Sequence, residues 1–181
     1  SDQRMQSLPR SPLAHVHPRR ACRYAAGGIN RIAKVFATQD GAELCRVQAP
    51  QPINAVVLIS VPRRWVGEDA TAPKLVVGTM GGIIHFYDVG TSTEDGSTPH
   101  TSGEAVLCMA AAAEGTRLAV GGKASHVCLY AVRYAREVGG AGNGDAVDKE
   151  VPLLQQLLRL TPVDGVVLSL ALDPACDVLV T

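Results

Sequence analysis

Three segments of the chain share one pattern at a long and regular interval. They cover residues 23–37, 74–88 and 117–131, and they repeat after 51 and then 43 residues. Each has a basic residue, a run of small or β-branched apolar residues that ends in glycine, and an aromatic residue nine positions after that glycine. The glycines are Gly27, Gly78 and Gly121, and the aromatic residues are Phe36, Tyr87 and Tyr130. Self-similarity at such a period indicates stacked copies of one supersecondary unit.

Each repeated segment is predicted to form a β-hairpin. Its apolar first half, such as residues 74–78, fits a strand that is buried on both faces. The glycine suits a tight turn or a close approach of backbone. The second half, such as residues 83–87, alternates around β-branched and aromatic residues, which favour strands.

Further strand candidates flank the hairpins and suggest four strands per repeat. The apolar runs are residues 53–61, 105–112 and 166–172. Residues 42–47 are expected to leave the first hairpin as a strand, and residues 177–181 to begin a fourth unit. Residues 153–160 fit either an outer strand or a short helix, because the spacing of their leucines matches both periods.

The aligned segments resemble WD40 repeats, whose period is about 40–45 residues with four strands per propeller blade. The similar stretches are LVVGTMGGIIHFYDV (75–89), VLCMAAAAEGTRLAVGGKASHVCLYAV (106–132) and VLSLALDPACDVLVT (167–181). The chain departs from the family at the Trp-Asp dipeptide, which survives only as Tyr87-Asp88. The Gly-His dipeptide and the turn aspartate of the family are missing, so the usual side-chain hydrogen-bond network is not expected.

The resemblance implies an all-β fold, a WD40-like β-propeller with about three blades of four-stranded antiparallel sheet. The blades are expected over residues 23–181, with loop insertions at residues 62–73 and 136–150. The last residues form an apolar run, so we expect the propeller to be incomplete at the C-terminus. The rest of a longer chain, or another chain, would then supply the missing blades.

Charge is balanced overall but unevenly distributed. Lysine and arginine total 17, as do aspartate and glutamate, so no global charge favours nucleic acid or an anionic membrane. Basic residues concentrate near the start, where residues 1–22 are predicted to be an irregular basic leader. The leader also fits a tail for an acidic partner, or an organellar transit segment, although its prolines interrupt the helix that a transit segment needs.

The cysteines and the hydropathy pattern narrow the class of protein. The five cysteines are widely spaced and include no CxxC pair, which predicts neither a disulfide framework nor a zinc site. Such cysteines fit a reducing compartment. No apolar run approaches the roughly 18 residues of a membrane span. We therefore expect an intracellular protein of the cytoplasm or nucleus, with an organelle left open.

No motif predicts catalysis, a cofactor or a metal. The glycine pairs lack the Walker pattern, and no Gly-x-Ser-x-Gly sequence occurs. His15 and His17 have no further candidate ligand nearby in sequence. His85 and His126 lie among apolar strand residues and are expected to be partly buried and hydrogen-bonded. The carboxylates of Glu94-Asp95 are expected in a solvated loop.

The predicted function is a non-catalytic scaffold or adaptor subunit of a eukaryotic multi-protein complex. The resemblance implies that the hairpin turns share one face and bind other subunits or peptides there. The candidate residues on that face are Asn30, Arg31, Met80, Ser125 and His126. Arg63, Arg64 and Trp65 are further candidates on the opposite face, because arginine and tryptophan are enriched at binding hot spots.

Two other functions stay open at this point. The basic leader fits an RNA- or organelle-associated assembly factor that contacts nucleic acid only through residues 1–22. A propeller enzyme would instead need polar side chains around the central channel. The innermost predicted strands carry four such candidates, Asn54, Ser60, Cys108 and Ser169.

Overall fold

Strands make up all the regular structure that the computed structural model describes, which covers residues 23–62, 71–112, 115–137, 149–161, 165–172 and 179–180. Across these ranges, no helix is long and apolar enough to span a membrane. The predicted leader at residues 1–22 lies outside the described residues.

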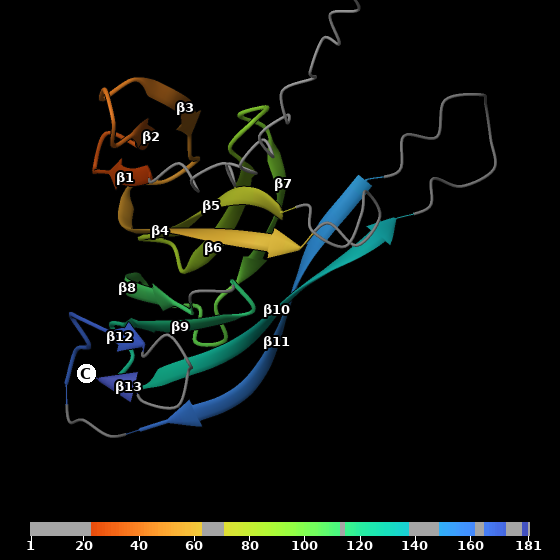
Figure 1. The fold of residues 1–181 in the computed structure, drawn as a ribbon. Helices are drawn as coiled ribbons and strands as arrows, with labels where there is room; N and C mark the ends of the chain where they lie inside the picture. Colours follow the sequence, from red (N-terminus) through yellow and green to blue (C-terminus); the bar gives the residue numbers. More distant parts are fainter. Residues whose placement is uncertain are drawn as a thin grey trace, which may run out of the picture.

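The strands form four antiparallel sheets in which neighbours in the chain are also neighbours in the sheet (Figure 1). The first sheet contains β1 (Arg23–Gly27), β2 (Ile32–Ala37) and β3 (Glu43–Gln48). The second contains β4 (Ile53–Pro62), β5 (Thr71–Thr79), β6 (Ile83–Asp88) and β7 (Glu94–Pro99). The third contains β8 (Val106–Ala111), β9 (Arg117–Gly122), β10 (Val127–Glu137) and β11 (Lys149–Leu160). The fourth pairs β12 (Ala171–Leu172) with β13 (Leu179–Val180).

The three predicted hairpins are β1–β2, β5–β6 and β9–β10, and they share one register. In each, the repeat glycine pairs with the residue six positions later: Gly27 with Ala33, Gly78 with Ile84, and Gly121 with Val127. The aromatic residue then pairs with the residue three positions before the glycine: Phe36 with Tyr24, Tyr87 with Leu75, and Tyr130 with Leu118. The constant nine-residue spacing is therefore a constant hairpin geometry.

The repeat glycines are explained by contact with the next sheet rather than by the turn. None of the three has a positive φ. A Cβ built on Gly27 would lie 2.7 Å from Val56 of β4, and one on Gly121 would lie 2.7 Å from Val167. A Cβ on Gly78 would collide with Val106 of β8. Each glycine thus lets the innermost strand or segment of the following unit approach its backbone.

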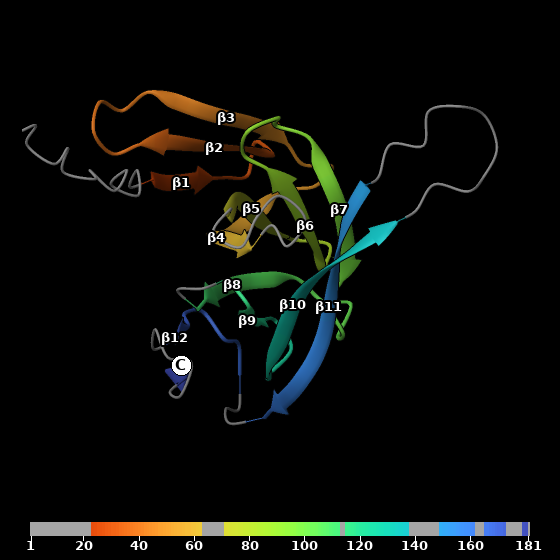
Figure 2. The ribbon, with the colours of Figure 1, turned by 45° about the vertical axis from the view of Figure 1, so that its right-hand side comes forward.

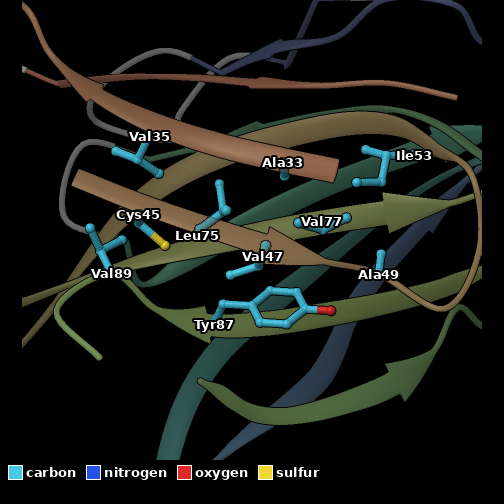
Figure 3. Packing of buried hydrophobic residues seen from close by; sticks show 10 residues of the cluster. All are labelled: Ala33, Val35, Cys45, Val47, Ala49, Ile53, Leu75, Val77, Tyr87 and Val89. Atoms are coloured by element: carbon cyan, nitrogen blue, oxygen red, sulfur yellow. The ribbon is translucent and has the colours of Figure 1, made fainter. Parts of the chain in front are cut away.

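The sheets pack face to face in chain order (Figure 2). Side chains of the first sheet and the second point toward one another and form one buried cluster, shown in Figure 3, which includes Val35, Val47, Leu75, Val77 and Tyr87. A second cluster joins the second sheet to the third. A third cluster places Val167 against the third sheet. Apolar burial between sheets, not within a single sheet, is therefore what holds the layers together.

The all-β expectation is confirmed, one open alternative is settled, and two local interpretations are wrong. Residues 153–160 belong to β11, so the strand alternative holds and the helix does not. The expected strand over residues 166–172 is regular only at β12, Ala171–Leu172. Glu94 and Asp95 begin strand β7, not a solvated loop. Pairing with β6 supplies backbone hydrogen bonds there that override the weak strand propensity of this polar stretch.

The two predicted insertions extend into residues that the structure places in strands. Pro62 at the end of β4 pairs with Thr71 at the start of β5. Glu137 at the end of β10 pairs with Lys149 at the start of β11. The remaining parts of the insertions, residues 63–70 and 138–148, lie outside the described residues.

A buried ion cluster joins three strands of the second sheet. Lys74 of β5 is only 3% exposed. Its Nζ lies 2.8 Å from Asp88 Oδ2 and 2.7 Å from Asp95 Oδ2. The same ammonium group lies 5.5 Å from the ring centroid of Tyr134 on β10, in the next sheet. Asp88 also ends β6 by accepting hydrogen bonds from the backbone N–H groups of Gly90 and Thr91.

Acid is expected to destabilise the fold through Asp88. Burial opposes its ionisation, but the hydrogen bonds from Lys74, Thr91 and Gly90 outweigh burial and lower its pKa below the ordinary 3.8. Its ionised form therefore stabilises the fold above about pH 4, and this contribution is lost as the pH falls through the lowered pKa. Urea denaturation at several pH values should show the difference in stability between wild type and Asp88→Asn narrowing from about pH 5 toward about pH 3. A difference that does not vary with pH would contradict this role.

Candidate functional site

Hydrogen bonds connect the hairpin turns to the segments that lead into a sheet, either the turn's own sheet or the next one. Arg31 O accepts from Ala49 N at 2.8 Å, and Pro52 O accepts from Met80 N at 3.0 Å. The chain of contacts continues where Gly82 O accepts from His100 N at 2.7 Å.

The same pattern recurs at the third hairpin. Ala105 O accepts from Lys123 N at 3.2 Å, and Gly122 O accepts from Val167 N at 3.0 Å. Turns and connecting segments thus alternate along one end of the stacked sheets. We call this end the turn face and define it by residues 28–31, 49–53, 79–82, 100–105, 122–126 and 165–168.

Most of the residues predicted from the sequence to bind a partner lie on the turn face. Asn30, Arg31, Met80 and Ser125 are all exposed there. Asn30 shapes its turn, because its Oδ1 accepts a hydrogen bond from Ile32 N at 3.2 Å, and Arg31 adopts a left-handed φ of 65°. His126 differs from the others, because its side chain is only 4% exposed.

Large apolar side chains are also exposed on the turn face. Ile29 is 82% exposed, Met80 52% and Leu168 75%. Single exposed apolar residues are normal, but here three of them lie on separate segments of the same turn face. Sequence reasoning selected Met80 and missed Ile29 and Leu168. The signal for Ile29 was its place at the tip of the first hairpin, where a polar residue is usual.

Arg63, Arg64 and Trp65 lie outside the described residues. The residues that flank them, Pro62 and Thr71, pair at the end of the β4–β5 ladder remote from the turn face.

A buried polar network lies directly beneath the turn face. His100 is 2% exposed and Tyr130 is 3% exposed. His100 Nδ1 lies 2.8 Å from the Tyr130 hydroxyl, which is also 2.8 Å from Thr101 Oγ1. Thr101 Oγ1 in turn donates to Gln156 Oε1 at 2.8 Å. The network therefore joins the segment before β8 to β10 and β11.

His126 and Cys128 complete this buried group. The rings of His100 and His126 are stacked with centroids 5.8 Å apart. Cys128 is fully buried two residues after His126. Arg159 of β11 approaches from the exposed side, with Nη2 3.3 Å from His126 Nδ1. The sequence expectation of a buried, hydrogen-bonded histidine is confirmed at His126.

The protonation states of this group follow from its burial. Burial, assisted by His126 and Arg159, lowers the pKa of His100 to about 4. Burial, assisted by Arg159, also lowers the pKa of His126. Burial raises the pKa of the Cys128 thiol. Near neutral pH the group therefore presents two neutral imidazoles and one thiol.

The polar side chains of the inner strands also take part in contacts between sheets. Asn54 Nδ2 donates to Val106 O at 3.0 Å, and Cys108 Sγ donates to Val167 O at 3.4 Å. Ser60 lines a shallow pocket together with Arg23 and Pro73. Asn54 and Cys108 therefore connect successive sheets.

The antiparallel sheets follow one another in chain order and pack face to face, as the blades of a partial WD40-like β-propeller do. Among solved structures, a chain in the crystal structure of the mitotic checkpoint complex is similar, with a TM-score of 0.57 and 16% sequence identity. The match covers 87% of this chain and only 41% of that chain, so this chain spans less than half of its length. No protein-family model matches the sequence. No curated protein matches it either. Similarity at this level of identity establishes the fold alone.

Proposed function

We propose that this chain is a non-catalytic interaction module, a scaffold or adaptor subunit of a eukaryotic multi-protein complex in the cytoplasm or nucleus. It binds a protein partner through the turn face. The observation that carries this proposal is the exposure of Ile29, Met80 and Leu168 on three segments of that face. Burying apolar side chains of this kind against a partner is the main favourable term in protein association.

The surroundings of these side chains indicate the chemistry of the partner. Arg31 and Lys123 are exposed on the same face and supply positive charge. The segment before β8 adds one exposed acid, Glu104. We therefore expect a partner segment with two or three apolar anchors and flanking acidic residues. The hydrogen bonds between turns and connecting segments hold the face in shape before binding, which reduces the entropy lost on association.

The test is a double substitution, Ile29→Asp with Met80→Asp. Proteins captured by the wild-type chain from native lysate should be identified, and their binding to purified variants then measured. The double variant should bind a direct partner at least about tenfold more weakly, because each buried anchor typically contributes more than 1 kcal/mol. A matched control is Leu44→Asp on β3, where an apolar side chain of similar exposure (41%) lies away from the turn face.

Thermal unfolding of all three proteins checks that the changes act on binding and not on folding. A direct partner that binds the double variant as tightly as it binds wild type would overturn the proposal for this face. Equal weakening by Leu44→Asp would show that the effect is not specific to the turn face.

The proposal includes the division of the chain into a leader at residues 1–22 and blades over residues 23–181. A role of the leader in RNA or organelle association remains an alternative, and deleting residues 1–22 tests it separately. Unchanged RNA binding and localisation after that deletion would remove its support.

A further inference from the structure

We propose that His100, His126 and Cys128 form a binding site for a zinc ion beneath the turn face. This inference goes beyond the interaction function proposed above and does not depend on it. The three residues come from two parts of the chain, the segment before β8 and the start of β10.

The geometry suits a metal ion. One ring nitrogen from each histidine and Cys128 Sγ all lie within 4.8 Å of one another. In a tetrahedral zinc site, with bonds of about 2.0–2.3 Å, neighbouring ligand atoms lie roughly 3.3–3.6 Å apart. Side-chain rotations that shorten the longest of these distances by about 1.2–1.5 Å would place the three ligand atoms on one ion.

Two ring nitrogens of the group lack partners. Nε2 of His100 and Nε2 of His126 are buried and have no hydrogen-bond partner within the described part of the chain. Burying such a group without a partner is unfavourable, and native proteins rarely do it without a reason. A metal ion would satisfy both nitrogens at once.

The network around His100 is the kind that supports a metal ligand. Metal-binding histidines usually donate their second ring N–H to an oxygen, which fixes the tautomer and the ring orientation. His100 Nδ1 has such an oxygen in the Tyr130 hydroxyl, 2.8 Å away. With Nδ1 directed at Tyr130, Nε2 is the nitrogen left to bind the ion.

The donor set favours zinc over the hard cations. Imidazole and thiolate suit Zn²⁺, whereas Mg²⁺ and Ca²⁺ prefer oxygen ligands. Binding of the ion releases the thiol proton of Cys128 to solvent, so that the thiolate is the ligand. Three protein ligands leave a fourth position for water or a group from a partner.

Arg159 is expected to weaken binding of the ion at this site. Its guanidinium lies 3.3 Å from His126 Nδ1 and can only donate hydrogen bonds. It therefore favours the neutral tautomer with the proton on Nε2, which competes with a metal there. Arg159 is exposed on β11, so its side chain can turn toward solvent when the ion binds.

The test is titration of the purified, metal-free chain with Co²⁺ and with Zn²⁺. Co²⁺ bound by a thiolate gives a ligand-to-metal charge-transfer band in the near ultraviolet, and we expect this band at one equivalent. Cys128→Ser should abolish the band. A matched control, Cys45→Ser, removes a buried cysteine of the first sheet and should retain it.

Calorimetry with Zn²⁺ gives a second readout. His126→Asn should weaken binding at least about tenfold, because it removes a ligand. Arg159→Gln should strengthen binding, and this exposed change is not expected to impair folding. Wild-type protein that binds no Co²⁺ or Zn²⁺, or that binds Co²⁺ without a thiolate band, would overturn the proposal. Equal Zn²⁺ affinity in wild type and Arg159→Gln would contradict a site at His126.

Discussion

Replacement of Lys74 by methionine should lower the free energy of unfolding by about 3–5 kcal/mol, the usual effect of removing one partner from a buried ion pair. The ammonium group of Lys74 lies within 2.8 Å of carboxylate oxygens on both Asp88 and Asp95, and its side chain is only 4% exposed. Methionine keeps most of the volume but removes the charge that holds the two carboxylates near each other. Urea denaturation of wild type and variant measures the effect.

The chain offers a matched control for this substitution in Lys34→Met. Lys34 also pairs with a carboxylate, Glu43, at 2.6 Å, but its side chain is 29% exposed. Solvent screens that pair, so Lys34→Met should leave stability nearly unchanged. Similar decreases in the free energy of unfolding of the two variants would show that the buried Lys74 cluster stabilises the fold no more than an exposed ion pair does. Adding Asp88→Asn and Asp95→Asn to Lys74→Met should recover part of the loss, because the repulsion between carboxylates is then removed.

Gly78→Ala is expected to cost about 1–3 kcal/mol, as overpacking of a tight core does. Gly78 has an ordinary φ, so alanine brings no backbone strain there. Its added methyl group would instead collide with Val106 of the next sheet. The free energy of unfolding from urea denaturation checks this expectation.

Two further variants show whether contact between sheets is the cause. Gly28→Ala is the control, because the nearest atom to its added Cβ is Asn30 Oδ1 at 3.6 Å and its φ is not positive. This change should be neutral or slightly stabilising. The double variant Gly78→Ala with Val106→Ala should be less destabilised than the sum of the two single changes. If the decreases in the free energy of unfolding are additive, the destabilisation by Gly78→Ala arises within the hairpin and not from contact between sheets.

The hairpins could be predicted because their determinants are close together in sequence. The register that pairs Gly78 with Ile84 and Leu75 with Tyr87 depends on a turn and on alternating side chains within fourteen residues. The same pattern appeared three times, so the stacked-sheet architecture followed from the repeat. The turn face was also predicted, since antiparallel strands in chain order return each equivalent turn to the same end.

The reason for the repeat glycines could not be read from the sequence. Both a turn and a close backbone approach require glycine, and the pattern left the two open. Only the position of Val106, on a different sheet, shows that the close approach is the cause at Gly78.

The polar residues of β7 were misassigned for a similar reason. Glu94 and Asp95 have the composition of a loop, and nothing nearby in sequence reveals that Asp95 meets Lys74 of β5 across the sheet. The long-range ion pair with Lys74 and the backbone hydrogen bonds to β6 stabilise this polar stretch as strand β7.

The buried group of His100, His126 and Cys128 also could not be predicted from the sequence. His126 and Cys128 are two positions apart in the sequence, but His100 lies 26 residues before His126. Local patterns of glycine, apolar and aromatic residues were sufficient for strands, turns and their repeat, because these depend on neighbouring residues. Which buried polar side chains come into contact depends on how the sheets pack against one another. The spacing of residues in the sequence does not give those distances, so only the tertiary structure decides these contacts.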